Sequence, residues 1–416
     1  MREMKDSGIE WIGEIPKHWK IKKPKYIGSI RSGDSVTNKK LNDDIGYEVL
    51  GGNGTIGFYD KYNVDGTHII IGRVGALCGN SRITRGKKFI SDNALIYTCF
   101  EGQAENYINY IFDAFNLNKL NTSNAQPLIT GSKVLNIFIP YPYIIEQKII
   151  ADFLDSKCSE IDATAEDIQK EISLLEEYKK SVITEAVTKG LNPDAEMKDS
   201  GIEWIGDINP KASLCRLKFF SYMKGRIGWQ GLKSEDFIDN GPYCVTGTDF
   251  INGKINWDTC YHVSEERYKM DSNIQLKIGD LLVTKDGTIG KLAKVTELPE
   301  KACLNSHLLI IRPLNERFTN EYLYYVISSD VFVRYYKYSS TGSTIESLSQ
   351  DKLGNFIFPV YDLLSQQQIV DYLDTKCSEI DSLIDDKKRQ LDILADYKKS
   401  LIYEYVTGKK EVPVNE

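Results

Sequence analysis

The chain has 416 residues, of which 41% are hydrophobic and 27% are charged. This length suggests about two to four domains, and this composition excludes a chain that is disordered throughout. The net charge of −7 argues against DNA binding if it is averaged over the whole chain. Phosphates are attracted only within a Debye length of about 10 Å, however, so the charge of each segment matters more than the total.

Several broad classes of protein are not expected. The sequence has no apolar leader and no apolar run of about 18 residues, which predicts a soluble, cytoplasmic protein without a membrane span. Its eight cysteines form no CxxC pair, so reduced thiols are expected instead of disulfides or a zinc site. The four histidines lie far apart, and no metal site is expected.

The chain is a tandem repeat. A short tag, MKDSGIEWIG at Met4–Gly13, returns letter for letter at Met197–Gly206. Two further stretches recur, KCSEID at 157–162 and 376–381, and YKKS at 178–181 and 397–400. The order of tag, variable block and helical block therefore occurs twice. The predicted domains are a tag (1–16), head 1 (17–143), helical block 1 (144–190), a linker with the second tag (191–210), head 2 (211–363), helical block 2 (364–410) and a tail (411–416).

Each variable block, or head, is predicted to be a mixed α/β domain. In head 1, the runs His68–Ile71 and Ala94–Tyr97 are typical of strands, and 106–115 has the pattern of an amphipathic helix. Head 2 repeats this pattern, with strands at 280–283 and 308–311 and a helix at 321–336. Head 1 carries 16 Lys and Arg against 10 Asp and Glu, whereas head 2 carries 19 against 18. Only head 1 is clearly basic.

Each helical block has an apolar seam with the heptad spacing of a left-handed coiled coil. The first seam comprises Leu154, Cys158, Ile161, Ala165, Ile168, Ile172, Leu175, Val182 and Ala186, with Lys179 as a polar interruption. The second comprises Leu373, Cys377, Ile380, Ile384, Leu391, Leu394, Leu401 and Tyr405, with Lys387 and Lys398 intruding. About 40 helical residues would form a rod of about 60 Å. We expect the two helices to pair; the alternative is that each helix packs on its own head.

This arrangement resembles the specificity subunit of type I restriction–modification systems. The opening MKDSGIEWIGEIP at Met4–Pro16 is similar to the family's usual start, and PYPYIIEQKIIADFL at Pro140–Leu154 is similar to its transition from a recognition domain into a conserved helix. The segments Gly72–Gly79, Ser91–Asn93 and Lys285–Gly290 resemble its internal landmarks. The second copy departs from the pattern at Tyr361–Gln366, which is a weaker version of the helix entrance.

The resemblance implies an α+β protein with two target recognition domains, joined by two long helices in an antiparallel coiled coil. Each domain would read one half of an asymmetric bipartite site in double-stranded DNA, without catalysis by this chain. Two DNA methyltransferase subunits would dock on the helices, and restriction (translocase–nuclease) subunits would join the larger complex. S-adenosylmethionine, ATP and magnesium would belong to those partners. A protein with two DNA-binding heads should match the approximate twofold symmetry of duplex DNA, which makes the two helices antiparallel. The length of the helices would then set the distance between the two half-sites, as a ruler would.

Candidate DNA-binding residues are those with forked or multiple hydrogen-bonding groups in loops, because such groups can read base edges. Most other contacts are expected to position phosphates. The alternative for each candidate is a turn residue or a solvated charge. The candidates in head 1 are Gly52, Asn53, Arg73 and Asn80, with Arg82, Arg85, Lys87 and Lys88 as a basic strip for phosphates. Those in head 2 are Lys224, Arg226, Trp229, Gln230, Thr246, Thr248, Asp249, Lys285, Lys291 and Ser343.

Enzyme classes are disfavoured by the motifs. A methyltransferase needs an Asn-Pro-Pro-aromatic loop, and the nearest match, Asn192–Asp194, lies in a linker. An ATPase needs GxxxxGK[ST], and Gly287–Leu292 lacks both the spacing and the hydroxyl. The remaining rivals are a coiled-coil scaffold that binds only proteins and a fused nuclease. Divergent heads of one fold disfavour the scaffold, and the missing catalytic motifs disfavour the nuclease.

Overall fold

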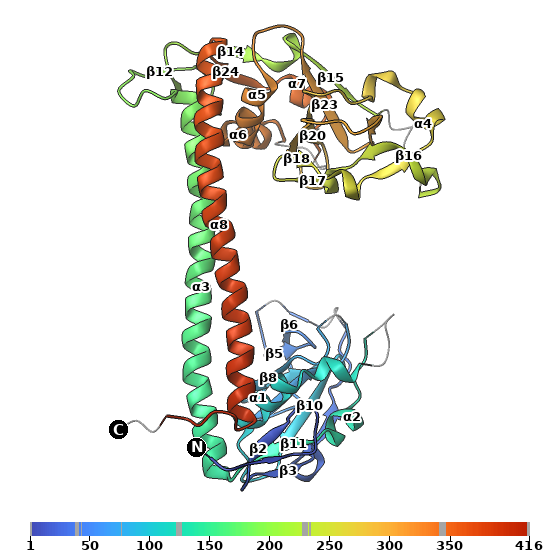
Figure 1. The fold of residues 1–416 in the computed structure, drawn as a ribbon, viewed down its shortest axis with the longest axis vertical. Coiled ribbons are helices and arrows are strands. Elements are labelled where there is room, and N and C mark those ends of the chain that lie inside the picture. Colours follow the sequence, from blue (N-terminus) through green and yellow to red (C-terminus); the bar gives the residue numbers. More distant parts are fainter. Residues whose placement is uncertain are drawn as a thin grey trace. The chain divides into compact units, whose positions relative to one another are not determined.

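The structure is a computed structural model (Figure 1) that describes residues 2–37, 41, 42, 44–75, 77–121, 127–226, 232, 234–340 and 347–413. The chain divides into two compact units. Unit 1 comprises Met1–Gln169 and Lys388–Glu416, and unit 2 comprises Lys170–Lys387. Each unit holds one head and parts of both long helices. The boundary between the units therefore cuts through the helices, whereas the predicted domains separate head from helix.

Head 1 is built on an antiparallel sheet of four strands. Their order is β4 (Gly28–Ser32), β10 (Ala94–Cys99), β7 (His68–Gly72) and β8 (Ser81–Thr84). The inner strands β7 and β10 are largely apolar and mostly buried, and β7 carries three isoleucines in a row, a residue type that favours strands. A second sheet has the order β6 (Thr55–Tyr59), β5 (Tyr47–Leu50) and β9 (Phe89–Ile90), and β5 and β9 run parallel.

The remaining elements of head 1 connect this sheet to the long helix. The tag forms a hairpin, and β3 pairs with β11 just before the helix begins. These elements are β1 (Met4–Asp6), β2 (Glu14–Pro16), β3 (Lys20–Lys22), η1 (Pro24–Tyr26), α1 (Glu105–Phe115), η3 (Leu117–Leu120), α2 (Gly131–Asn136) and β11 (Ile139–Tyr141).

Head 2 repeats the same topology with additions at one edge. Its main sheet has the order β15 (Ser221–Gly225), β23 (Leu308–Pro313), β20 (Leu281–Thr284), β21 (Leu292–Lys294), β18 (Lys254–Ile255) and β17 (Phe250–Ile251). The second sheet has the order β19 (Tyr261–Val263), β16 (Phe237–Val245) and β22 (Ala302–Leu304), again with one parallel pair, β16 and β22. The expectation of two divergent heads with one α+β fold is therefore confirmed.

The helices of head 2 differ from the sequence prediction at one point. Residues 321–336, expected as one helix, belong to two: they include all but the first residue of α5 (Asn320–Ser328) and the first part of α6 (Asp330–Ser340). The break is at Ser329, whose hydroxyl bonds back to the carbonyl of Val326 at 2.6 Å. Further elements of this half are β12 (Lys198–Asp199), β13 (Asp207–Ile208), β14 (Ser213–Arg216), η4 (Leu217–Phe219), η6 (Ser234–Asp236), η7 (Gly247–Asp249), η8 (Trp257–Thr259), α4 (Glu265–Lys269), η9 (Ser272–Ile274), α7 (Gln350–Gly354) and β24 (Ile357–Val360).

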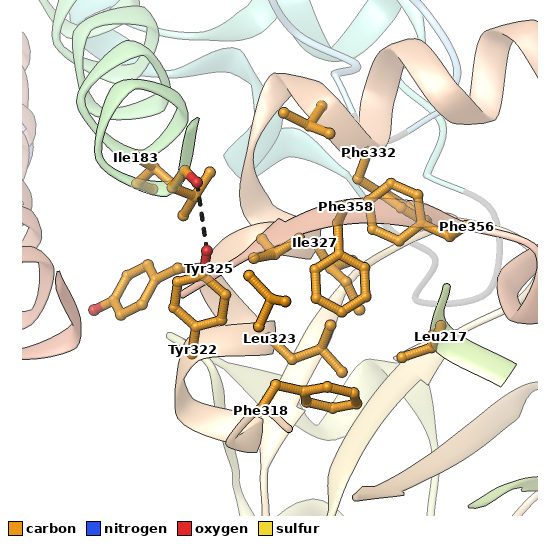
Figure 2. Close-up of a cluster of buried hydrophobic side chains, with 14 of the residues drawn as sticks. Ile183, Leu217, Phe318, Tyr322, Leu323, Tyr325, Ile327, Phe332, Phe356 and Phe358 are labelled. Atoms are coloured by element: carbon orange, nitrogen blue, oxygen red, sulfur yellow. Dashed lines mark hydrogen bonds between the residues drawn. The ribbon is translucent and has the colours of Figure 1, made fainter. Parts of the chain in front are cut away.

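The core of head 2 continues onto the long helix. Figure 2 shows the aromatic centre of this core, where Phe356 and Phe358 from the end of the head lie beside Phe332 and Leu323 from its helices. Ile183 of the first long helix belongs to the same cluster. Aromatic side chains of this size dominate the burial of apolar surface. The head is thereby fixed to the helix by a continuous apolar core.

The two long helices, α3 (Ile144–Lys189) and α8 (Leu363–Val406), run antiparallel within each unit. In unit 1, Lys398 near the end of α8 lies 2.7 Å from Asp162 in the first half of α3. In unit 2, Lys179 near the end of α3 lies 2.6 Å from Asp381 in the first half of α8. The repeated KCSEID stretch of each copy thus meets the repeated YKKS stretch of the other copy. This reciprocal contact is what a pseudo-twofold repeat requires.

Each lysine that interrupts an apolar seam forms an ion pair with a carboxylate on the facing helix. Besides Lys179 and Lys398, Lys387 lies 2.5 Å from Glu171 on the facing helix. Each lysine stem is half-buried while its ammonium reaches a carboxylate at the rim. All the other seam residues named above are buried or half-buried.

The helices pack on the heads as well as on each other. Leu154 and Cys158 of α3 share one core with Leu401 of α8 and with Phe112 of head 1. A buried tyrosine marks each junction: the hydroxyl of Tyr107 donates to Val406 O at 3.1 Å, and that of Tyr322 donates to Pro359 O at 2.9 Å and lies 3.4 Å from Val187 O. The two expected alternatives, helix pairing and packing on a head, therefore occur together.

The repeated tag has a structural role in each unit. In unit 1, Tyr403 of α8 donates to the carbonyl of Trp11 at 3.1 Å, and the Trp11 indole donates to Phe138 O at 3.1 Å. In unit 2, the equivalent Trp204 indole donates to Ile357 O, also at 3.1 Å. Ile205 of the second tag also shares a core with Val187 of α3, so each tag contacts both the end of a long helix and a head.

The entrance to each long helix is held by a buried glutamine. Gln147 donates to Pro142 O at 2.9 Å, and Gln366 donates to Tyr361 O at 2.8 Å; neither side chain is exposed. The glutamine is therefore retained in the second copy, although the preceding residues differ. There, Ser365 replaces Glu146, which in unit 1 lies 2.9 Å from Arg2.

Candidate nucleic-acid interface

In head 1, three loops that are distant in sequence gather around Arg73, the residue that directly follows β7. The Arg73 amide donates to Asn93 O at 2.9 Å, and Arg73 O accepts from the amide of Ile129 at 3.0 Å. The glycine turn after β5 approaches so closely that a Cβ at Gly52 would lie 2.8 Å from Asn93 O. The sequence candidates Gly52, Asn53 and Arg73 therefore belong to one cluster of loops.

Head 2 contains the same cluster around Lys285, the residue that directly follows β20. The Lys285 amide donates to His307 O at 3.0 Å, and Lys285 O accepts from the amide of Leu348 at 2.7 Å. Lys291 Nζ donates to Gly247 O at 3.1 Å, which ties the loop after β20 to the loop after β16. The candidates Lys285, Lys291, Thr246 and Thr248 lie in these two loops.

A cationic cavity of about 420 Å³ lies beside Arg73 in head 1. Three basic side chains, Lys25, Arg31 and Arg73, and three hydroxyl groups, Ser32, Thr130 and Ser132, contribute to its lining. None of the described lining residues is Asp or Glu. The basic side chains favour a negatively charged ligand, and Ile30, Leu95 and Leu135 add apolar surface to the same cavity.

The basic strip of head 1 largely finds partners within the head. Lys88 forms an ion pair with Glu48, and hydrogen bonds from Lys88 and then Thr55 hold the pKa of Glu48 below its usual value. Arg82 donates to Gly51 O, and burial lowers the pKa of its guanidinium. Arg85 donates to Asn106 Oδ1 at 3.1 Å, and Lys87 Nζ lies 4.7 Å from the ring centre of Tyr62.

Arg226 and Asp249 of head 2 are held inside the protein. Arg226 is only 2% exposed, and its Nε donates to Leu304 O at 3.0 Å, so its guanidinium is not available to DNA in this structure. Arg226 directly follows β15 and lies against Cys303 and Leu304 of β22. Asp249 is 1% exposed and accepts from the Thr246 amide at 2.8 Å and from Thr259 Oγ1 at 2.9 Å.

Other candidates lie apart from the loop clusters or outside the described residues. Asn80 is exposed and lines a separate cavity of about 290 Å³ with Asp113 and Lys399. Lys224 is half-buried on β15. Trp229, Gln230 and Ser343 lie outside the described residues.

The structure also places residues at these loops that the sequence did not single out. In head 1, Ser32 Oγ accepts from Arg73 Nη1 at 2.9 Å. In head 2, His307 Nδ1 lies 2.8 Å from Asp286 Oδ1, next to Lys285. The signal that could have found His307 is its place relative to the sheet. Asn93 and His307 each directly precede an inner strand of the main sheet, and this equivalence becomes visible only when the strands of the two heads are matched.

Three further properties concern metal binding, the cysteine thiols and membrane insertion. Among the described residues, no group of three or more His, Cys, Asp or Glu side chains could hold a metal ion. All eight cysteines are free, and burial raises the pKa of both Cys215 and Cys377 to about 11, so these thiols stay protonated at neutral pH. Within the described part of the chain, no helix is long and apolar enough to cross a membrane.

Comparisons with known proteins agree with this architecture. The chain is 23% identical to the MjaVIII specificity subunit of a type I restriction enzyme from Methanocaldococcus jannaschii, over 99% of this chain and 95% of that protein. It is 33% identical to the EcoprrI specificity subunit from Escherichia coli, over 35% of this chain and 34% of that protein.

A solved structure has a similar fold. It comes from a type I R-M system described in terms of complex assembly and conformational transition, and it aligns over 95% of this chain and 99% of its own with a TM-score of 0.66 at 14% identity. The family model described as "Type I restriction modification DNA specificity domain" matches residues 16–174 and 230–392, which together make up most of the chain. The chain therefore belongs to the type I restriction–modification DNA specificity family, carries the family's domain twice, and is a specificity subunit that recognises DNA sequence.

Proposed function

We propose that each head binds one half of an asymmetric bipartite DNA site and that the paired helices set the distance between the two halves. The observation that carries this proposal is the repetition of one loop cluster with different residues at its centre, Arg73 in head 1 and Lys285 in head 2. One fold with two different reading surfaces is suited to two different half-sites. The reciprocal contacts of α3 and α8 within each unit have the twofold relation that is expected of a protein that binds two half-sites of a DNA duplex.

Selection from randomised duplex DNA tests the proposal. The full chain is mixed with its methyltransferase partner, bound duplexes are recovered, and their sequences are determined. We expect enrichment of two short, different motifs separated by a gap of fixed length. Recovery of DNA without any enriched gapped motif, at a salt concentration where binding persists, would refute the bipartite reading.

The spacing role makes a separate prediction. Insertion of one heptad into each long helix, at equivalent positions of the two copies, should lengthen the helix pair by about 10 Å. Because base pairs stack about 3.4 Å apart, the gap between the half-sites should widen by about three base pairs while the half-site letters stay the same. The same selection measures both quantities. A changed half-site letter with an unchanged gap would contradict the ruler role.

We also propose that the chain is non-catalytic and that two methyltransferase subunits dock on the helices, with restriction subunits joining the full complex. Exposed apolar side chains recur at equivalent helix positions: Tyr178 and Tyr397 are 57% and 53% exposed, and Leu174 and Ile393 are 63% and 67% exposed. Such unburied apolar groups suit a protein interface. S-adenosylmethionine, ATP and magnesium are proposed to bind the partners.

The purified chain alone should transfer no methyl group from S-adenosylmethionine to a duplex that contains its site. The expectation rests on the sequence, which has no methyltransferase loop. Incorporation of radiolabelled methyl groups into DNA measures the activity, and the complex with the methyltransferase partner is the positive control. Transfer by the chain alone at a rate near that of the complex would overturn the non-catalytic role.

A further inference from the structure

Arg73 and Lys285 occupy the same place in the two heads. Each directly follows an inner strand of its main sheet, and the peptide groups of both are fixed on each side by equivalent bonds. The amide bonds to the residue that precedes β10 or β23, and the carbonyl accepts from Ile129 or Leu348. A side chain that leaves so constrained a backbone is held in a defined position, as a specific recognition site requires.

The guanidinium of Arg73 has donors to spare. Its Nη1 donates to Ser32 Oγ at 2.9 Å, which orients the group, whereas its Nε is buried without an acceptor among the described residues. No carboxylate of the described residues forms an ion pair with Arg73. Arg82, whose Nε is likewise unpaired, differs because its charge is balanced by Glu48 nearby. Nη2 forms no hydrogen bond with the described residues, so this donor is left to meet an acceptor from outside the protein.

The residues around Arg73 differ in which part of DNA they are expected to contact. Arg31 and Lys25 are exposed cations on the lining of the same cavity, and they suit phosphates. Arg73 is half-buried and is oriented by its hydrogen bond to Ser32, and it suits a base edge. Among base edges, guanine offers two acceptors, O6 and N7, in the spacing that matches the donors of a guanidinium.

Lys285 presents a different donor from the same position. Its Nζ forms no ion pair or hydrogen bond with the described residues, and Asp286 and His307 flank it. An ammonium is a compact point charge without the planar fork of arginine. The two heads therefore differ in hydrogen-bonding capacity at one equivalent point.

We infer that positions 73 and 285 are specificity-determining residues of the two heads, and that Arg73 reads a guanine in the half-site of head 1. The inference rests on the proposed bipartite recognition. It goes further by assigning one letter of one half-site to one side chain.

The experiment repeats the DNA selection with the full chain and its methyltransferase partner, using the variants Arg73→Gln, Lys285→Gln and Arg31→Gln. Arg73→Gln should lower the preference for one guanine by on the order of 10- to 100-fold and leave the other half-site unchanged. Lys285→Gln should alter a letter of the other half-site only. The control Arg31→Gln should weaken binding to all sequences without changing a letter.

The outcomes separate the inference from the function on which it rests. If the unaltered chain enriches a gapped motif but Arg73→Gln leaves every letter unchanged, the assignment of Arg73 is wrong and the bipartite function stands. If the unaltered chain enriches no gapped motif, both fail. Should Arg73→Gln not fold, Arg73→Met keeps an unbranched side chain of similar length but has no hydrogen-bond donor, so it should lose discrimination for the guanine; unchanged discrimination would overturn the inference.

Discussion

Replacement of Asp280 by alanine is expected to destabilise head 2 by about 3–5 kcal/mol, the usual cost of removing one partner from a buried ion pair. Asp280 is 2% exposed, and its carboxylate accepts from Arg312 Nε at 2.6 Å and Arg312 Nη2 at 2.8 Å. It also accepts from the amide of Lys277 at 2.7 Å. The variant would leave the Arg312 guanidinium, whose pKa Asp280 holds above its usual value, without its counter-charge.

Hydrogen exchange under mild denaturant measures this effect locally, which is necessary because a chain with two compact units need not unfold in one step. Amides of β20 and β23 should exchange faster in Asp280→Ala, whereas amides of head 1 should not change. The matched control is Asp239→Ala in the same head, since Asp239 is exposed on β16 and should change stability by less than about 0.5 kcal/mol. Equal exchange in the two variants would show that the ion pair contributes nothing.

The elements with strong periodicity could be predicted from the sequence. The heptad seams located both long helices, because a residue that faces an apolar partner must recur every three or four positions. Short apolar runs bounded by Gly, Asp or Asn located β7, β10, β20 and β23. The exact repeat of the tag predicted the duplication of the fold, since ten identical residues in series point to a copied unit.

The pairing of the two helices could be predicted, but individual polar contacts between distant segments could not. The lysines of the seams were read as interruptions because their carboxylate partners lie on the other helix, more than 200 residues away in the case of Lys179 and Asp381. The burial of Arg226 was missed for the same reason, because Leu304 O is supplied by a strand 78 positions later. A basic residue at the end of a strand resembles a surface residue until the covering strand is known.

The candidate interface was predicted in part. Arg73 and Lys285 are candidates because their side chains carry hydrogen-bond donors in predicted loops, and the structure places both at the centres of equivalent loop clusters. The strip from Arg82 to Lys88 was selected on charge alone, yet charge does not reveal that Glu48 lies opposite Lys88. Net charge over a segment is therefore a weaker guide than the position of a residue relative to the sheet.

Replacement of Leu154 by alanine is expected to destabilise unit 1 by about 2–5 kcal/mol, through lost apolar burial and the cavity that remains. Leu154 is fully buried in the core that also contains Leu401 and Tyr405 of α8. Amides at the end of α8 should therefore exchange faster in Leu154→Ala, although they lie about 250 positions away in sequence. Leu174→Ala is the matched control, because Leu174 is 63% exposed on the same helix.

Because the chain is a pseudo-twofold repeat, the equivalent substitution in the second copy tests whether the helices stabilise each other. Leu373 of α8 is equivalent to Leu154, is also fully buried, and shares a core with Val182 and Ala186 of α3. Leu373→Ala should therefore accelerate exchange at the end of α3 by a similar factor and leave the end of α8 unaffected. If instead each variant loosened only its own helix, the helices would be stabilised independently by their heads. The proposed spacing role depends on antiparallel pairing of the helices. Such pairing requires that each substitution accelerate hydrogen exchange in the facing helix of the other copy.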